Sequence, residues 1–139
     1  MEIVDTVYLV AYFRPSDPLH GTAVEVVENL SLERRVSQIA LVEFDLLMKS
    51  RRLSQSDRIS AWVLLQGLIG ADAIELVTPL DMAAATFLSS RYGIDYFDSI
   101  IAGQCLLRKA KPLTTDEEII RTVNMSKEIR KQMKELGIL

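Results

Sequence analysis

The chain has 139 residues, of which 49% are hydrophobic and 25% are charged, an ordinary composition for one globular domain with a single core. Its 16 Lys and Arg residues against 19 Asp and Glu residues give a net charge of −3, which argues against a protein that coats nucleic acid through bulk positive charge. A single cysteine and a single histidine exclude an internal disulfide and a Cys/His zinc site.

The apolar run VYLVAYF at residues 7–13 is too short to cross a bilayer, and no basic segment precedes it. We therefore expect no signal peptide and no interaction with a membrane. Because the only thiol has no partner within the chain, the expected location is the cytoplasm. No composition shift or linker divides the sequence, so we expect one domain over residues 1–139.

Strands and helices alternate along the chain. The predicted strands are residues 2–4, 35–39, 73–77 and 111–115, with a further strand at the end of the chain. The predicted helices are residues 21–31, 39–52, 54–70, 79–93, 95–110 and 116–123 and the segment that starts at residue 126. Residues 6–13 either continue the first strand or begin a helix capped by Thr6. This order predicts an α/β fold, a three-layer α/β/α sandwich with a central, mainly parallel sheet of about five strands.

Glu43 is the conspicuous acid, because it lies in the dense apolar stretch IALVEFDLLMKSRR that starts at residue 39. On a helix, the neighbouring Asp45 lies beside Lys49 and near Arg52, so it has basic partners of its own. Glu43 has only apolar helical neighbours. Such a carboxylate either reaches solvent at the rim of the apolar face or needs a partner, a proton or a metal ion.

Three more acids follow strands or open helices, where ligands of parallel sheets bind. These residues, Asp5, Asp98 and Asp116, also have plain structural explanations: a cap after the first strand, a capping box of Asp95 with Asp98, and one of Thr115 with Glu118. A doubly wound sheet can bring distant carboxylates to one edge. Clustered carboxylates imply a cation, and oxygen ligands alone indicate Mg²⁺ or Mn²⁺, which serve phosphoryl chemistry.

Four segments, VDTVYLVAYF, IALVEFDLLMK, YGIDYFDSIIAGQCL and PLTTDEE, in this order and spacing, resemble PIN-domain nucleases, especially toxins of the VapC type. The resemblance covers nearly the whole chain. It implies a PIN-like sandwich and a metal-dependent ribonuclease that hydrolyses RNA phosphodiester bonds with one or two Mg²⁺ or Mn²⁺ ions. It further implies the toxin of a toxin–antitoxin pair, with a cognate antitoxin protein and a second copy of the chain as partners.

The same resemblance implies the residues of the site. The catalytic and metal-ligating residues would be Asp5, Glu43, Asp98 and Asp116, with Asp95 as a further candidate ligand and Thr6 and Thr114 as supporting residues. Val7 departs from the family, which often has Ser or Asn at this position. Arg51 and Arg52 are candidate RNA contacts, although a solvated helix end explains them more simply.

Two other functions compete with the nuclease. The first is a non-catalytic PIN-like module that acts through a protein partner. The second is a phosphoacceptor receiver-like domain, which fits less well because the chain lacks an early pair of adjacent acids. The sequence contains neither a Walker-type phosphate loop nor a dinucleotide-binding fingerprint. The sequence does not determine the RNA target, the preference for RNA over DNA or the number of ions.

Overall fold

The computed structural model describes all residues from 1 to 139 and contains one four-stranded parallel sheet. Its strands are β1 (Glu2–Val4), β2 (Arg34–Ser37), β3 (Ile74–Glu75) and β4 (Lys111–Leu113), in the order β3-β2-β1-β4. The four internal strands of the prediction are confirmed. The third is shorter than expected, because a 3₁₀ turn, η1 (Ala71–Ala73), takes its first residue and the strand ends at Glu75.

The strand predicted at the end of the chain is wrong. Gly137 adopts a φ of +76°, a conformation that favours glycine, and turns the chain back after the last helix. The amide of Ile138 then donates to the carbonyl of Met133 at 2.9 Å, and the Ile138 side chain packs against a buried apolar cluster. The last residues therefore cap a helix instead of extending the sheet.

Eight helices surround the sheet. They are α1 (Thr6–Tyr12), α2 (His20–Val27), α3 (Gln38–Ser50), α4 (Gln55–Leu68), α5 (Pro79–Tyr92), α6 (Tyr96–Arg108), α7 (Glu117–Asn124) and α8 (Ser126–Glu135). Residues 6–12 are helical, and Asp5, not Thr6, caps this helix by accepting a hydrogen bond from the amide of Thr6. No helix combines the length and the hydrophobicity that crossing a bilayer requires.

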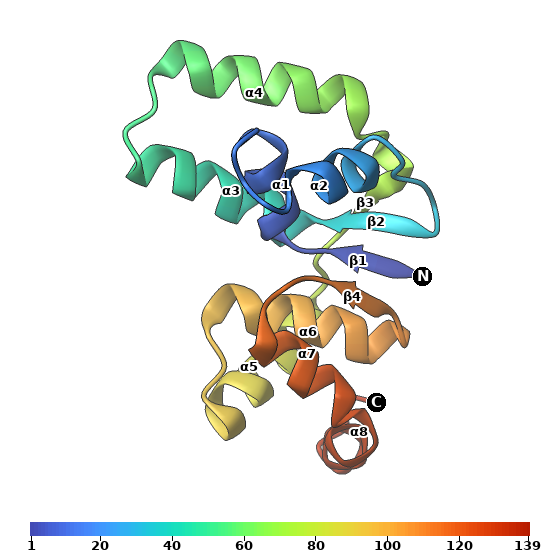
Figure 1. The fold of residues 1–139 in the computed structure, drawn as a ribbon. Helices are drawn as coiled ribbons and strands as arrows, with labels where there is room; N and C mark the ends of the chain where they lie inside the picture. Colours follow the sequence, from blue (N-terminus) through green and yellow to red (C-terminus); the bar gives the residue numbers. More distant parts are fainter.

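The helices form two layers with the sheet between them, as Figure 1 shows: α1 to α4 lie on one side and α5 to α8 on the other. Successive residues of β1 point to opposite faces. Val4 joins the core cluster formed with the first layer, whereas Ile3 packs with Ile101 and Ile119 from α6 and α7. The predicted three-layer α/β/α sandwich is confirmed.

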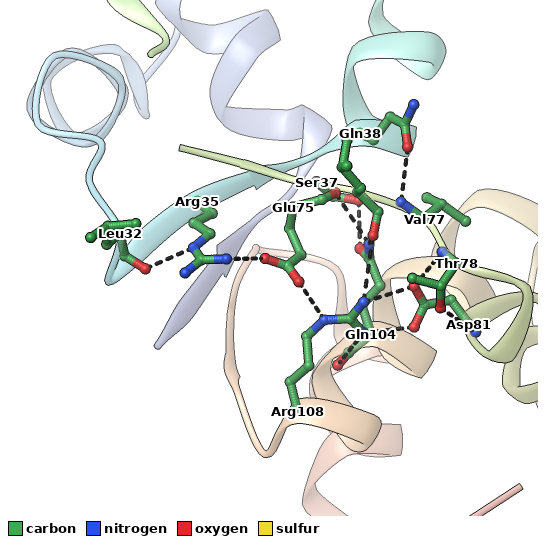
Figure 2. Close-up of polar contacts among 11 residues, drawn as sticks. Leu32, Arg35, Ser37, Gln38, Glu75, Val77, Thr78, Asp81, Gln104 and Arg108 are labelled. Carbon is green, nitrogen blue, oxygen red and sulfur yellow. Dashed lines mark hydrogen bonds and ion pairs between the residues drawn. The ribbon is translucent and has the colours of Figure 1, made fainter. Parts of the chain in front are cut away.

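A buried polar network fixes α6 against the end of β3 and the start of α5 (Figure 2). The Arg108 guanidinium donates to Glu75 Oε1 at 2.5 Å and to Asp81 Oδ1 at 2.6 Å. Arg35 donates to the other oxygen of Glu75 at 2.8 Å. Burial alone would raise the pKa of Asp81, but the hydrogen bonds from Arg108 hold this pKa below its usual value.

The network extends to the first residues of α3 through Gln104 (Figure 2). Gln104 Oε1 accepts a 2.6 Å hydrogen bond from the hydroxyl of Ser37, which is also the N-cap of α3. Gln104 Nε2 donates to the carbonyls of Glu75 and Leu76. Because α3 carries Glu43 and α6 carries Asp98, these bonds set the relative position of two candidate site helices.

Replacing Arg108 should therefore cost much more stability than replacing an exposed arginine. Arg108→Met leaves the fully buried Asp81 without its cation, and we expect a loss of about 3–5 kcal/mol in the free energy of unfolding. Arg91→Met, an exposed residue in the last turn of α5, should change it by no more than about 0.5 kcal/mol. Urea unfolding of both variants measures the difference, and equal effects would contradict the assigned role.

Candidate metal centre

The candidate site lies where the strand order reverses. The chain leaves β1 toward β2 on one side, while β4 pairs with β1 on the other, so the carboxyl ends of β1 and β4 meet at a switch point. Asp5 follows β1 directly, and Thr114 and Asp116 follow β4. Residues more than a hundred positions apart in sequence thus become neighbours.

Asp5 is held rigidly at this point. Its Oδ1 accepts a 2.7 Å hydrogen bond from the amide of Thr6, and its Oδ2 accepts a 2.6 Å bond from the hydroxyl of Thr114. The same hydroxyl accepts from the amide of Asp116 at 2.9 Å. Asp5 is only 5% exposed, and this burial raises the pKa of its carboxyl despite the bonds that favour the charged form.

An open cavity of about 560 Å³ lies over this switch point. Its lining residues are Asp5, Thr6, Val7, Val10, Glu43, Leu47, Arg51, Asp95, Asp98, Thr115, Asp116 and Glu117. The cavity thus gathers every predicted ligand, the further candidate Asp95 and the predicted supporting residue Thr6. Thr114 does not line it but positions Asp5, and Arg52 lies outside it with a φ of +58°.

The carboxylates at the cavity disfavour one another's ionisation. Burial raises the pKa of Asp98 to about 7, and the charges of Asp116, Asp5 and Glu43 add to this rise. Burial also raises the pKa of Glu43; the nearby Thr6 hydroxyl opposes this rise, and the charges of Asp5 and other acids add to it. None of these carboxylates forms an ion pair, since all seven ion pairs of the structure involve other acids.

The two capping boxes predicted around Asp98 and Asp116 are wrong. Asp95 occupies the N-cap position of α6, but its side chain makes no capping hydrogen bond, and the Asp98 carboxylate makes none either. At α7, the N-cap is Asp116, which accepts a 3.1 Å bond from the amide of Ile119. The structural explanation thus fails for Asp98 and is only partial for Asp116, which keeps its second oxygen available.

Asp45 pairs with a different helix from the one predicted. Its carboxylate accepts hydrogen bonds from Arg58 at 3.0 Å and from the indole of Trp62 at 3.0 Å, both on α4. Lys49 and Arg52, the partners expected from helical spacing, make no ion pair with it. The contrast that singled out Glu43 is nevertheless present, because Asp45 has a cation and Glu43 has none.

The residues present fit a hard divalent cation. All candidate ligands are carboxylate or hydroxyl oxygens, which Mg²⁺ and Mn²⁺ prefer. The hydroxyl of Thr6, a residue 3% exposed on the cavity wall, makes no hydrogen bond of good geometry, although it lies close enough to the Glu43 and Asp5 carboxylates to lower their pKa values. A buried hydroxyl without a partner is costly, so a water or an ion in the cavity would satisfy it.

One acid near the site was missed by sequence reasoning. A ligand oxygen of Glu118 lies within 4.8 Å of oxygens of Asp98 and Asp116, and all three residues are half-buried. The predicted capping box had given Glu118 a local role, which concealed it. The available signal was its position two residues after Asp116, in the same first turn of a helix.

An apolar groove of about 470 Å³ adjoins the acidic cavity. It lies between α1, α3 and α4, and it shares Val10, Leu47 and Arg51 with the cavity. Phe13 and Phe44, whose rings stack at 5.5 Å, form part of its wall, and the half-exposed Leu64 lies on α4. The groove and the acidic cavity therefore form one continuous depression with Arg51 at the junction.

Acidic residues gathered at the switch point of a parallel sheet, between two helical layers, agree with the PIN-like sandwich that the sequence predicts. The model of the PIN domain family matches residues 3–124, and the chain belongs to this family. A search of curated proteins finds no match to the sequence.

Three solved structures share the fold of this chain. The FitAcB structure from Neisseria gonorrhoeae superposes with a TM-score of 0.68 at 19% identity, over 89% of this chain and 94% of that one. VapC20 of Mycobacterium tuberculosis, a toxin that cleaves the sarcin-ricin loop, superposes with a TM-score of 0.66 at 20% identity. The match covers 87% of this chain and 94% of VapC20. VapBC2 of Rickettsia felis, bound to a promoter DNA fragment, superposes with a TM-score of 0.62 at 15% identity. The match covers 88% of this chain and 93% of that chain.

The pKa of Asp98 predicts how the stability of the metal-free protein depends on pH. Between the unfolded value of 3.8 and the folded value of about 7, the folded state binds more protons, so stability falls as pH rises through this window. Asp98→Asn should have a higher Tm than the unchanged protein at about pH 8 and a weaker pH dependence from about pH 5 upward. Thermal unfolding in chelator measures both, and an identical pH dependence would refute the assignment.

Proposed function

We propose that this chain is a metal-dependent endoribonuclease and the toxin of a toxin–antitoxin pair. The observation that carries the proposal is the set of carboxylates around one cavity, with no cation paired to any of them. Membership of the PIN domain family and the similarity in fold to VapC20, described as a toxin that cleaves the sarcin-ricin loop, support it.

Asp5, Glu43, Asp98 and Asp116 would hold one or two Mg²⁺ or Mn²⁺ ions, with Asp95 within reach of the same cavity. When bound, a divalent cation supplies polarisation of a phosphoryl oxygen and acidification of water. Thr114 orients Asp5 and favours its charged form, since its hydroxyl donates to Asp5 Oδ2. Because the pKa of Asp98 is about 7, loading the site near neutral pH displaces a proton from Asp98, and affinity for the cation should rise with pH.

Arg51 is the residue we assign to a phosphate of the substrate. It is exposed, it caps the end of α3, and it lines the acidic cavity. A guanidinium at this edge can donate to phosphate oxygens that the carboxylates themselves repel. Arg52, although adjacent in sequence, lines neither the acidic cavity nor the apolar groove.

The proposed protein partner is an antitoxin that covers the apolar groove. The groove exposes apolar side chains beside the acidic cavity, and Arg51 belongs to both. A segment seated there would bury this apolar surface and restrict access to Arg51. RNA as the substrate and a homodimer as the assembly stay predictions.

Removal of one ligand should abolish cleavage without unfolding the protein. Asp5→Asn and Glu43→Gln should each lower the rate of RNA cleavage by about 100-fold or more. Mutation of residues that only hydrogen-bond to metal ligands typically lowers activity by roughly 10–100-fold, and loss of a ligand itself should exceed this. Glu135→Gln, an exposed acid at the end of α8, is the control and should keep full activity. The assay uses structured RNAs and single-stranded DNA with Mg²⁺ or Mn²⁺, with and without chelator.

Wild-type cleavage that continues in chelator would overturn the metal dependence. Absence of both cleavage and cation binding would favour the non-catalytic interaction module instead. Cleavage of DNA but not of RNA would keep the nuclease and change its substrate class.

The two neighbouring arginines should differ in their effect on substrate binding. Arg51→Ala should raise KM for RNA roughly tenfold with little change in kcat, as expected for loss of one charge-assisted hydrogen bond worth about 1.5 kcal/mol. Arg52→Ala, the matched control, should leave both constants close to those of the unchanged enzyme. Steady-state kinetics of the two variants provides the comparison, and equal KM values would exclude the phosphate contact.

A further inference from the structure

A second open cavity, of about 490 Å³, lies at the opposite end of α6 and β4 from the acidic cavity. We call it the basic pocket, and its lining residues are Cys105, Leu106, Lys109, Ala110, Val123, Ser126, Lys127 and Arg130. None of them lines the acidic cavity. Asp98 and Lys109, near the two ends of α6, lie about 16 Å apart along the helix axis. Since β4 runs from the basic pocket toward the acidic cavity (Figure 1), the two are separate sites.

The basic pocket gathers positive charge in a protein whose net charge is −3. Lys109, Lys127 and Arg130 line it, and no acid does. None of these three cations forms an ion pair, since all seven ion pairs of the structure involve other groups. Burial raises the pKa of the Cys105 thiol to about 12, so this residue adds no negative charge near neutral pH. The three cations therefore line one pocket without a counter-charge from the protein.

Local structure does not account for all three cations. Arg130 donates a hydrogen bond to the carbonyl of Leu106 near the end of α6, where the helix dipole favours a cation. The charge of Lys109 suits the same dipole, but its φ of +54° is a left-handed conformation that glycine adopts without strain. Lys127 lies in the first turn of α8, where the dipole favours an acid. Local structure thus explains Arg130, explains Lys109 only in part and does not explain Lys127.

A phosphate group would supply the missing counter-charge. A phosphate monoester carries close to two negative charges near neutral pH and three acceptor oxygens, and lysine and arginine are its usual partners. Arg130 donates to Leu106 through Nη1 only, which leaves its other donors for a ligand. The remaining lining is largely apolar, with Leu106, Ala110 and Val123, and offers a surface to a sugar or a base.

We propose that the basic pocket binds the phosphate monoester of a nucleotide, either a free nucleotide or the end of an RNA strand. Lys109, Lys127 and Arg130 contact the phosphate, and the apolar lining contacts the nucleoside. The inference goes beyond the proposed nuclease function and does not rest on it, because the pocket shares no residue with the acidic cavity.

The test measures binding of nucleoside 5′-monophosphates, each alone, to the full chain in chelator, by calorimetry and by shifts of the backbone amide signals in NMR spectra. Saturable binding should shift the amides of Lys109, Ser126 and Lys127. Lys109→Gly and Lys127→Gln should each weaken the affinity about tenfold, as expected for loss of one charge-assisted hydrogen bond. Lys134→Gln is the matched control, since this exposed residue of α8 does not line the pocket, and its affinity should stay within about twofold.

Two further probes identify the source of the phosphate: inorganic phosphate, and an RNA oligonucleotide prepared with and without a 5′-phosphate. Binding of free nucleotides, or binding of the RNA only when it carries the 5′-phosphate, supports the inference and separates the two sources. Inorganic phosphate that binds as tightly as every nucleotide overturns the recognition of a nucleotide. Absence of saturable binding by all probes, or an equal loss of affinity in Lys134→Gln, overturns the inference.

The Tm of each variant without ligand separates binding from folding. Lys109→Gly should match or exceed the wild type, since glycine suits the φ of +54° at this position. Lys127→Gln should also match the wild type, because it removes a cation from the first turn of a helix. A lower Tm in both variants would assign the lysines to the stability of the fold and overturn the inference. Because binding is measured in chelator and without cleavage, failure of the proposed nuclease function leaves this result unaffected.

Discussion

The parallel pairing of β1 with β4 is the constraint on which the candidate site depends. Residues 2–4 pair in register with residues 111–113, and the amide of Asp5 continues the ladder by donating to the carbonyl of Leu113 at 3.0 Å. This pairing alone brings Asp5 to Thr114 and Asp116. Since it joins segments more than a hundred residues apart, the acidic cavity exists only when the whole sandwich has formed, and its stability is that of the complete domain.

The sandwich holds a group of acids that repel one another, and the stabilising charges lie elsewhere. Arg108 and Arg35 neutralise Glu75 and Asp81 at β3 and α5, where hydrogen bonds satisfy nearly every buried polar atom. No arginine or lysine forms an ion pair at the cavity. This distribution is typical of functional sites. The hydrogen-bonded network around Arg108 stabilises the fold, and this stability offsets the repulsion among the carboxylates of the cavity until they bind a ligand.

Sequence reasoning identified the elements well and their contacts less well. The alternation of strands and helices predicted the sandwich, and the missing cation near Glu43 was visible from helical spacing. The partner of Asp45 was missed because Arg58 belongs to the next helix, and both capping boxes failed because other groups supply those hydrogen bonds or none do. Only the family resemblance connected Asp5, Glu43, Asp98 and Asp116, because their proximity comes from non-local strand pairing that no local pattern encodes.

The electrostatics of the chain also constrain how it can act on RNA under the proposed function. A net charge of −3 and the carboxylates of the cavity repel a polyanion, so the field of the whole protein does not attract the substrate. Attraction must then be local, from Arg51 at the rim and from neutralisation of Asp98, Asp116 and their neighbours by a cation. Loading of the carboxylates therefore precedes productive RNA binding, and affinity for RNA should depend more on divalent ion than on the few phosphate contacts that monovalent salt screens.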